Sequence, residues 1–289
     1  MASLKDIKKR INSVRNTQQI TKAMKMVSAA KLRKAQQAVL ATRPYAEKMG
    51  AIIANLVPKA KDISHPLLKE RPRERALILL LTGDRGLCGG FNANISKTVE
   101  KFIRANPENF QQIDIAVIGR KGNEYLKRRS GMNIIKVYEN ITSDVNYQTA
   151  ALLADELSTA YTEEKYDVIF LYYNTFRSVI SQVITRIQLL PVVMPEGEED
   201  LYAETDYIFE PNPSEVLCQL LEKNVEVQIF RAMLESRASE QGARMTSMDS
   251  ATKNATEMIG KLTLMYNRAR QAAITTELME IISGAEAIK

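Results

Sequence analysis

Two long stretches of the chain repeat apolar residues every three or four positions and contain few residues that break helices. Residues 3–57 hold no Gly before position 50 and no Pro before position 44, so we expect one helix, about 80 Å long at 1.5 Å per residue. Its apolar seam begins with Leu4, Ile7, Ile11 and Val14. After Asn16 the apolar positions shift to Ile20, Met24 and Val27. This shift predicts a phase slip in a coiled-coil seam.

The second stretch follows two prolines at 211 and 213 and contains no Pro from residue 214 to 288. It predicts a helix of about 110 Å. A heptad seam with many small residues occupies positions 245, 248, 252, 255, 259, 262, 266, 269 and 273. Such a seam needs a partner helix, and we expect the N-terminal helix to pack against it in the antiparallel direction.

Between these helices the pattern alternates between short apolar runs and amphipathic segments. The runs at 76–82, 114–118, 134–137 and 167–173 predict strands, and 94–105, 121–129 and 147–161 predict helices. A polar-alternating run at 181–189 predicts an edge strand. The fold class is therefore α/β, a Rossmann-like doubly wound domain plus a long antiparallel coiled coil of the terminal helices. We expect a helix at 1–57, a linker at 58–74, the α/β domain at 75–195, an acidic loop at 196–213 and a helix at 214–289.

The composition of the chain argues against a membrane-spanning protein, an exported protein and a metal-dependent enzyme. With 45% hydrophobic and 26% charged residues the chain is expected to be globular. Its aliphatic runs are too short to span a membrane, and its charged N-terminus is unlike an export signal. Two Cys far apart and a single His, His65, predict free thiols and leave little material for a metal site or a His-based triad.

Positive charge is concentrated near the N-terminus. Twelve of the first 50 residues are Lys or Arg, against Asp6 and Glu47. A basic helix can be a solvated face, or it can bind an acidic protein loop, a lipid surface or nucleic acid. No aromatic residue precedes Tyr45, so stacking on bases is unavailable there, although binding to a duplex backbone stays open.

A glycine-rich turn, residues 83–92 (GDRGLCGGFN), follows the first predicted strand, where dinucleotide-binding domains place their phosphate loop. The spacing fits neither the dinucleotide fingerprint nor a P-loop. We expect a tight turn without a cofactor, in which Arg85 and Cys88 face a partner protein, although Cys88 is equally compatible with a buried, inert thiol. No residue set predicts catalysis.

Four segments resemble the γ subunit family of F-type ATP synthases. They are residues 20–32 (ITKAMKMVSAAKL), 84–92 (DRGLCGGFN), 235–245 (ESRASEQGARM) and 262–282 (LTLMYNRARQAAITTELMEII). The resemblance spans the chain from Ser3 to Ala287. We expect the first and last of these segments to lie together at one end of the coiled coil.

The resemblance implies a non-catalytic rotor that turns inside a hexamer of α and β subunits and rests on the ε subunit and the c-ring. Ion flow would drive the rotation, and ATP would form on β. It implies a peripheral protein at the cytoplasmic face of a bacterial membrane, without direct membrane insertion, a cofactor or a nucleic-acid partner. The inserted regulatory cysteine pair of chloroplast relatives is missing from this sequence, so redox control is not expected.

The resemblance also assigns contact residues. Those that match family positions at the β catch loops are Met24, Arg270, Gln271, Thr275 and Glu277, with Arg244 as a further coupling position. Asp84, Arg85 and Cys88 belong to the turn expected to face a partner. By itself, the seam pattern would have Met24 fill the coiled coil and would leave Arg270 and Glu277 solvated. A DNA-binding coiled coil and a nucleotide-dependent enzyme are the two rival functions.

Overall fold

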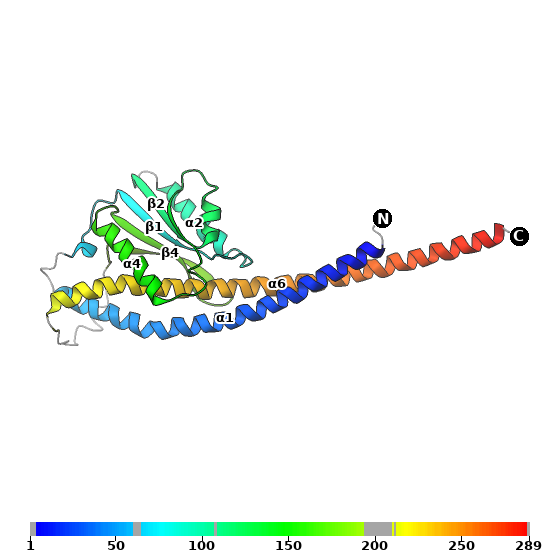
Figure 1. The fold of residues 1–289 in the computed structure, drawn as a ribbon, viewed down its shortest axis with the longest axis horizontal. Coiled ribbons are helices and arrows are strands. Elements are labelled where there is room, and N and C mark those ends of the chain that lie inside the picture. The colour runs from blue at the N-terminus through cyan, green and yellow to red at the C-terminus, as the bar shows by residue number, and fades with distance from the viewer. Residues whose placement is uncertain (1–3, 60–64, 107–108, 194–209, 211, 288–289) are drawn as a thin grey trace. The chain divides into compact units, whose positions relative to one another are not determined.

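The computed structural model describes residues 4–59, 65–106, 109–193, 210 and 212–287 (Figure 1). The chain forms two compact units: Met1–Ser28 with Met245–Lys289, called here the coil unit, and Ala29–Arg244, called the α/β unit. Helices α1 (Leu4–Lys59) and α6 (Pro213–Ala287) each contribute residues to both units. Two long helices were expected from the terminal segments of the chain, and α1 and α6 confirm both of them.

The α/β unit contains one five-stranded sheet in the order β3-β2-β1-β4-β5. Its strands are β1 (Arg75–Leu81), β2 (Gln112–Ile118), β3 (Asn133–Tyr138), β4 (Val168–Phe176) and β5 (Gln182–Leu190). The helices that accompany it are α2 (Phe91–Ala105), α3 (Arg120–Leu126), α4 (Tyr147–Thr162) and the short 3-10 helix η1 (Pro66–Leu68). The first four strands are parallel and β5 is antiparallel at the edge. The predicted doubly wound sheet and its edge strand are confirmed.

The sheet is covered on both faces, which explains the continuous apolar runs in its central strands. On one face Leu77, Leu79 and Leu81 of β1 pack in a core with α4 and with the parts of α1 and α6 that belong to this unit. On the other face Ile78 and Leu80 pack with α2 and α3. Each fully buried leucine or isoleucine stabilises the fold by roughly 1.5–3 kcal/mol. The α6 helix is therefore part of the core of the α/β unit.

In the coil unit α1 and α6 run antiparallel, as expected. Side-chain hydrogen bonds join Gln18 to Thr256 at 2.7 Å and Thr21 to Thr252 at 2.8 Å, and Lys25 forms an ion pair with Asp249. The position numbers of each pair add to 273 or 274. By this register the start of α1 at Leu4 faces α6 near position 270.

The expected phase slip in α1 is wrong. Ile20 and Val27 are 59% and 54% exposed. The seam instead continues in phase from Val14 through polar residues, namely Gln18, Thr21, Lys25 and Ser28, which are buried or half-buried. Because three of these side chains pair with polar groups of α6, a polar seam here is satisfied and needs no apolar replacement.

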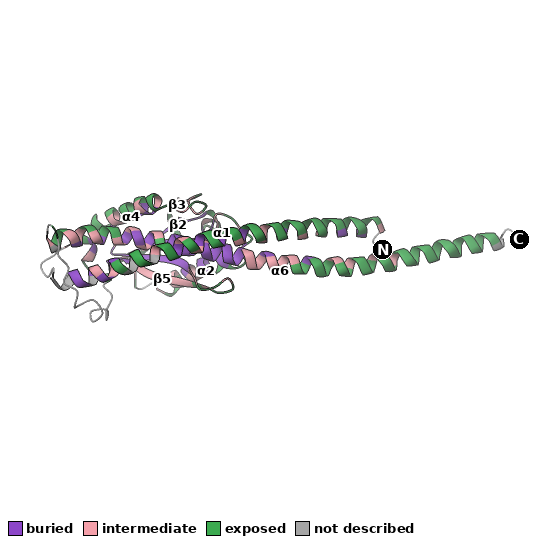
Figure 2. Ribbon diagram, turned by 90° about the horizontal axis from the view of Figure 1, so that it is seen from below, coloured by how far each residue is buried: buried purple, intermediate pink, exposed green. Residues whose placement is uncertain are grey.

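The heptad seam predicted for α6 is confirmed from Met245 to Ala269, where every predicted position is buried or half-buried. Ala273, the last predicted position, is exposed, as is every described side chain from Arg270 to Ala285 (Figure 2). The register explains this change, because α1 has no described residue opposite that part of α6.

Most of the expected acidic loop, 196–213, lies outside the described residues, and so does part of the expected linker. The five-part division of the chain therefore stays a prediction. Of the helices in the described part of the chain, none combines the length and apolar character that crossing a membrane requires.

Candidate functional site

The strand order places a topological switch point between β1 and β4. From β1 the chain moves outward to β2 and β3, and then returns to the other side of β1 to form β4. Doubly wound proteins bind ligands outside the carboxyl ends of the strands at this point. The turn after β1, residues 83–90, lies there and is called the β1 turn below.

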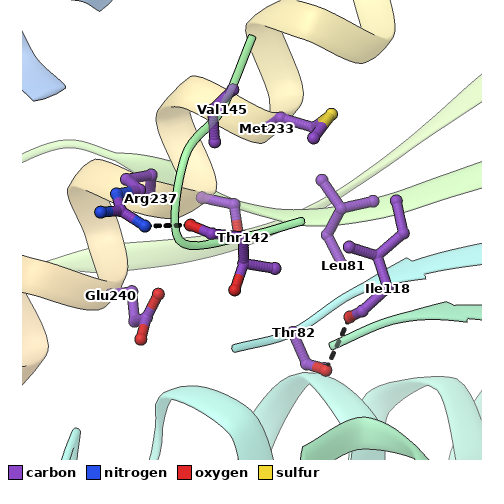
Figure 3. Close-up of a pocket in the computed structure, with 9 residues that line it drawn as sticks. Leu81, Thr82, Ile118, Thr142, Val145, Met233, Arg237 and Glu240 are labelled. Atoms are coloured by element: carbon purple, nitrogen blue, oxygen red, sulfur yellow. Dashed lines mark hydrogen bonds between the residues drawn. The ribbon is translucent and has the colours of Figure 1, made fainter. Parts of the chain in front are cut away.

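Helix α6 occupies this position. Ser239 of α6 is fully buried and donates a hydrogen bond to the backbone oxygen of Asn174 in β4, at 2.9 Å. The Glu240 carboxylate lies against Gly83, where an added Cβ would be 2.9 Å from Oε1. Arg237 donates to the backbone oxygen of Thr142, in the segment after β3 (Figure 3). Three residues of one helical segment thus contact β4 and the segments that follow β1 and β3.

The space left at this edge is small. A cavity of about 10 Å³ remains, with room for about one water molecule. Among the residues that line it are Leu81, Thr82, Met233 and Glu240 (Figure 3). A cofactor pocket measures about 300–1,000 Å³, and a phosphate would meet the carboxylate of Glu240. The geometry therefore favours an internal helix-docking site over a nucleotide site.

Arg244 links α6 to the β1 turn. Its Nη2 donates to Oε1 of Glu240 at 2.6 Å and to the backbone oxygens of Arg85 and Gly86 at 3.4 and 3.2 Å. Arg244 and Glu240 are only 8% and 6% exposed. Sequence reasoning named Arg244 but missed Glu240, although the i, i+4 spacing of opposite charges could have identified the pair.

The β1 turn is held by several side chains. Asp84 accepts hydrogen bonds from the Arg120 backbone N–H and from Oγ1 of Thr142, at 3.1 and 2.6 Å. Asn92 accepts from the Gly83 N–H and donates to the backbone oxygen of Arg85. These bonds fix residues 83–85, the first part of the turn.

The three residues of this turn named from the sequence have different environments. Arg85 is exposed, Asp84 is half-buried and Cys88 is buried at 2% exposure, against Phe91 and Ala243. Burial raises the pKa of the Cys88 thiol, against a smaller opposing effect of Arg244. Of the two alternatives for Cys88, the buried thiol is the one observed.

Sequence reasoning missed Leu87, at the tip of the β1 turn. It is 63% exposed and has a φ of 63°, a left-handed conformation that leucine rarely adopts. A leucine in a glycine-rich turn carries no sequence signal for this backbone angle.

In the coil unit Met24 is half-buried, while Arg270, Gln271, Thr275 and Glu277 are exposed. The Thr275 hydroxyl donates to the Gln271 backbone oxygen at 2.9 Å. By the observed register Met24 faces α6 near position 250, about 30 Å along the helix from Arg270. The expectation that residues 20–32 and 262–282 lie together at one end of the coiled coil is therefore wrong. Met24 and Arg270 lie at two separate positions along the coil.

Comparisons with known proteins agree with this architecture. A family model described as ATP synthase matches residues 3–288. The ATP synthase gamma chains of Geobacter metallireducens and Anaeromyxobacter dehalogenans are 60% and 48% identical to this chain, with all of both chains covered.

Solved structures are also similar. A chain from the central stalk and c-ring of the Tetrahymena thermophila mitochondrial ATP synthase is 28% identical, with a TM-score of 0.60 over 80% of this chain and 99% of that one. A chain from the Euglena gracilis mitochondrial ATP synthase rotor is 19% identical, with a TM-score of 0.66 over 94% and 98% of the two chains, and supports the fold alone. From the family match and the full-length relatives, the chain belongs to the ATP synthase gamma-chain family.

Proposed function

We propose that this chain acts as the central stalk of an F-type ATP synthase, turning inside a hexamer of α and β subunits and coupling ion flow to ATP synthesis. It is a non-catalytic subunit of that complex. Ion flow turns the stalk, and the stalk brings the catalytic sites of its partners through different states in turn.

The observation that carries this proposal is the exposed end of α6. Every described side chain from Arg270 to Ala285 is exposed, and five of these are large and apolar, namely Ile274, Leu278, Met279, Ile281 and Ile282. Contiguous exposed apolar residues mark a surface that another protein covers. Ile274, Leu278, Ile281 and Ile282 stand at i, i+4, i+7 and i+8, so they share one face of the helix, which a partner subunit would cover.

Two contact sites follow for the β subunits. Arg270, Gln271, Thr275 and Glu277 would meet the catch loops, and Met24 would meet an acidic loop about 30 Å away along the coil. The helix that carries Met24 supports this assignment, because it also presents exposed basic residues, namely Lys8, Lys9, Arg10, Arg15 and Lys22. Opposite charges favour association and orientation of two surfaces.

The remaining partners belong to the base of the complex. The α/β unit would rest on the ε subunit and on the c-ring, at the cytoplasmic face of the membrane. The similar chain from Tetrahymena thermophila belongs to an assembly of central stalk and c-ring, which supports this placement.

Reconstitution tests the role. Purified α and β subunits are mixed with and without the full chain, and ATP hydrolysis is measured. We expect a several-fold rise in hydrolysis that depends on this chain. Hydrolysis that stays the same over a titration of the chain would contradict the proposal.

Met24→Lys tests the coupling site. The variant adds a cation beside the proposed acidic loop, so ATP-driven ion pumping should fall relative to hydrolysis while the melting temperature stays unchanged. Met26→Lys is the matched control, because Met26 is 61% exposed on the same helix and points in another direction. Equal ratios of ion pumping to hydrolysis in the two variants would show that Met24 has no special role in coupling.

A further inference from the structure

Positive side chains gather on the face of the α/β unit that carries α2 and α3. These two helices pack on one face of the sheet, and α4 packs on the other (Figure 1). The cations belong to α2 and to the residues that follow α3, and all of them are exposed. The group, called the basic patch below, consists of Lys97, Lys101, Arg104, Lys127, Arg128 and Arg129.

The carboxylates of the two helices do not neutralise this patch. Glu100, the one acidic residue of α2, is shared between Arg104 at 2.9 Å and Arg129 at 3.6 Å. It thereby holds the α2 side of the patch beside the α3 side. Glu124, the one acidic residue of α3, is paired with two other cations of its own helix. Four cations of the patch form no ion pair with a described residue, namely Lys97, Lys101, Lys127 and Arg128.

The surroundings of the patch are unlike a protein interface. Among the described residues of α2 and α3, no large apolar side chain is exposed. Stable protein interfaces have an apolar or aromatic centre and are depleted in Lys. Tyr125, the nearby aromatic residue, is half-buried under the Arg129 guanidinium and is not free to stack on a base. The patch therefore fits a partner that offers negative charge over an area without a matching shape.

We propose that the basic patch contacts the anionic lipid headgroups of the membrane beside the c-ring. Clusters of about four to eight Lys and Arg attract anionic lipid surfaces, and the attraction falls off within about 10 Å at moderate salt. The placement beside the c-ring rests on the proposed function, whereas the affinity for anionic lipid does not. Because lipids are mobile, the patch would exchange one headgroup for the next as the stalk turns, without one fixed partner that holds it.

Vesicle flotation of the full chain tests the affinity. Vesicles of phosphatidylcholine alone are compared with vesicles that contain about 30% phosphatidylglycerol, at about 0.05 M and about 0.3 M salt. At low salt we expect the chain to partition onto the anionic vesicles roughly tenfold more than onto the neutral ones, and at high salt we expect most of this difference to disappear. Equal partition onto the two kinds of vesicle at low salt would overturn the proposal.

A patch variant locates the binding. It combines Lys97→Gln, Lys101→Gln, Lys127→Gln and Arg128→Gln, which remove exposed charges without breaking an ion pair between described residues, so the melting temperature should stay unchanged. We expect its partition onto anionic vesicles to fall roughly tenfold. Parent-like partition would overturn the proposal.

The matched control removes the same charge from the basic part of α1. It combines four exposed positions, Lys8→Gln, Lys9→Gln, Arg15→Gln and Lys22→Gln. We expect a smaller loss of partition for this control than for the patch variant. An equal or larger loss would show that net charge or α1 binds the lipid, and would overturn the proposal.

A DNA shift assay on the same variants addresses nucleic acid as the partner. We expect the patch variant to bind mixed-sequence duplex DNA as the parent does. A loss of DNA binding that is confined to the patch variant would assign the patch to nucleic acid and would overturn the lipid contact.

Reconstitution separates the lipid contact from the proposed function. In a complex with α and β subunits, the proposed hexamer would cover the cations of α1 and the exposed end of α6, and would leave the patch accessible. We expect the complex with the patch variant to float with anionic vesicles roughly fivefold less than the complex with the parent chain, at equal ATP hydrolysis. Equal flotation of the two complexes would overturn the lipid contact. Failure of the parent chain to raise hydrolysis would contradict the proposed function and leave the results for the free chain standing.

Discussion

Gly83 lies where the β1 turn meets α6, and its replacement by alanine measures how tightly the two fit. The added Cβ would lie 2.9 Å from Oε1 and 3.0 Å from the carboxyl carbon of Glu240. Since Glu240 is 6% exposed, its carboxylate can move only by leaving Arg244. A charge-assisted hydrogen bond contributes about 1.5–3 kcal/mol. We therefore expect Gly83→Ala to lower the free energy of unfolding by about 2–3 kcal/mol.

Urea unfolding followed by tyrosine fluorescence provides the measurement, since the chain has 11 Tyr and no Trp. With a slope of about 3 kcal/mol per molar urea, the midpoint should fall by about 1 M. Gly50→Ala in α1 is the control, because nothing lies within 4 Å of its added Cβ. It should raise the free energy of unfolding by up to about 1 kcal/mol, from helix propensity.

A second variant pair identifies the cause. In the Glu240→Ala background the carboxylate is gone, so adding Gly83→Ala should leave the midpoint unchanged. A midpoint that falls by about 1 M in both backgrounds would show that the contact with Glu240 does not explain the cost, and the fit between the β1 turn and α6 would then be looser than described.

Three further predictions follow from separate features. Leu87→Gly relieves the left-handed strain of the backbone and should raise the free energy of unfolding by up to about 1 kcal/mol in urea; a lower free energy of unfolding would show that the backbone at Leu87 is not strained. In thermal melting, Ile20→Lys should change the free energy of unfolding by less than about 0.5 kcal/mol, whereas Thr21→Lys, at a seam position that is 8% exposed, should lower it by more than about 1 kcal/mol. A larger loss for Ile20→Lys than for Thr21→Lys would show that the seam shifts to Ile20, as the sequence predicted. Burial alone would raise the pKa of Asp167, but hydrogen bonds from the Arg75 side chain and from the N–H groups of Arg75 and Glu74 outweigh burial and hold this pKa below its ordinary value. The carboxylate therefore stabilises the fold above pH about 4 and loses that contribution at lower pH. Asp167→Asn should reduce the dependence of the free energy of unfolding on acid pH, whereas Asp155→Asn, at an exposed position, should leave it unchanged.

The central strands of the α/β unit could be predicted because their apolar runs are continuous where the sheet is covered on both faces. β1, for example, was expected at 76–82 and runs from Arg75 to Leu81. The seam of α6 was equally clear, because its small and apolar residues repeat without interruption. In both cases the residue types of an element are enough to predict which of its positions are buried.

The polar seam of α1 could not be predicted in the same way. Thr21 and Lys25 have the residue types of a solvated face, and only their partners on α6, more than 200 positions away, make them seam residues. Apolar Ile20 and Val27 were therefore mistaken for the seam. The β1 turn shows a related limit, since the angle of Leu87 and the pairing of Glu240 with Arg244 depend on how α6 packs against the end of β1.

The exposed end of α6 has a consequence for how such a chain is made. Its last 16 described exposed residues form a helix without α1 beside it, close to the length at which isolated helices become marginal in water. Newly made chains that have not met their partners would expose this apolar surface to one another. The lifetime of the free chain in the cell would then be limited by self-association before it is limited by unfolding. Balanced synthesis with the other subunits of the ATP synthase would protect it.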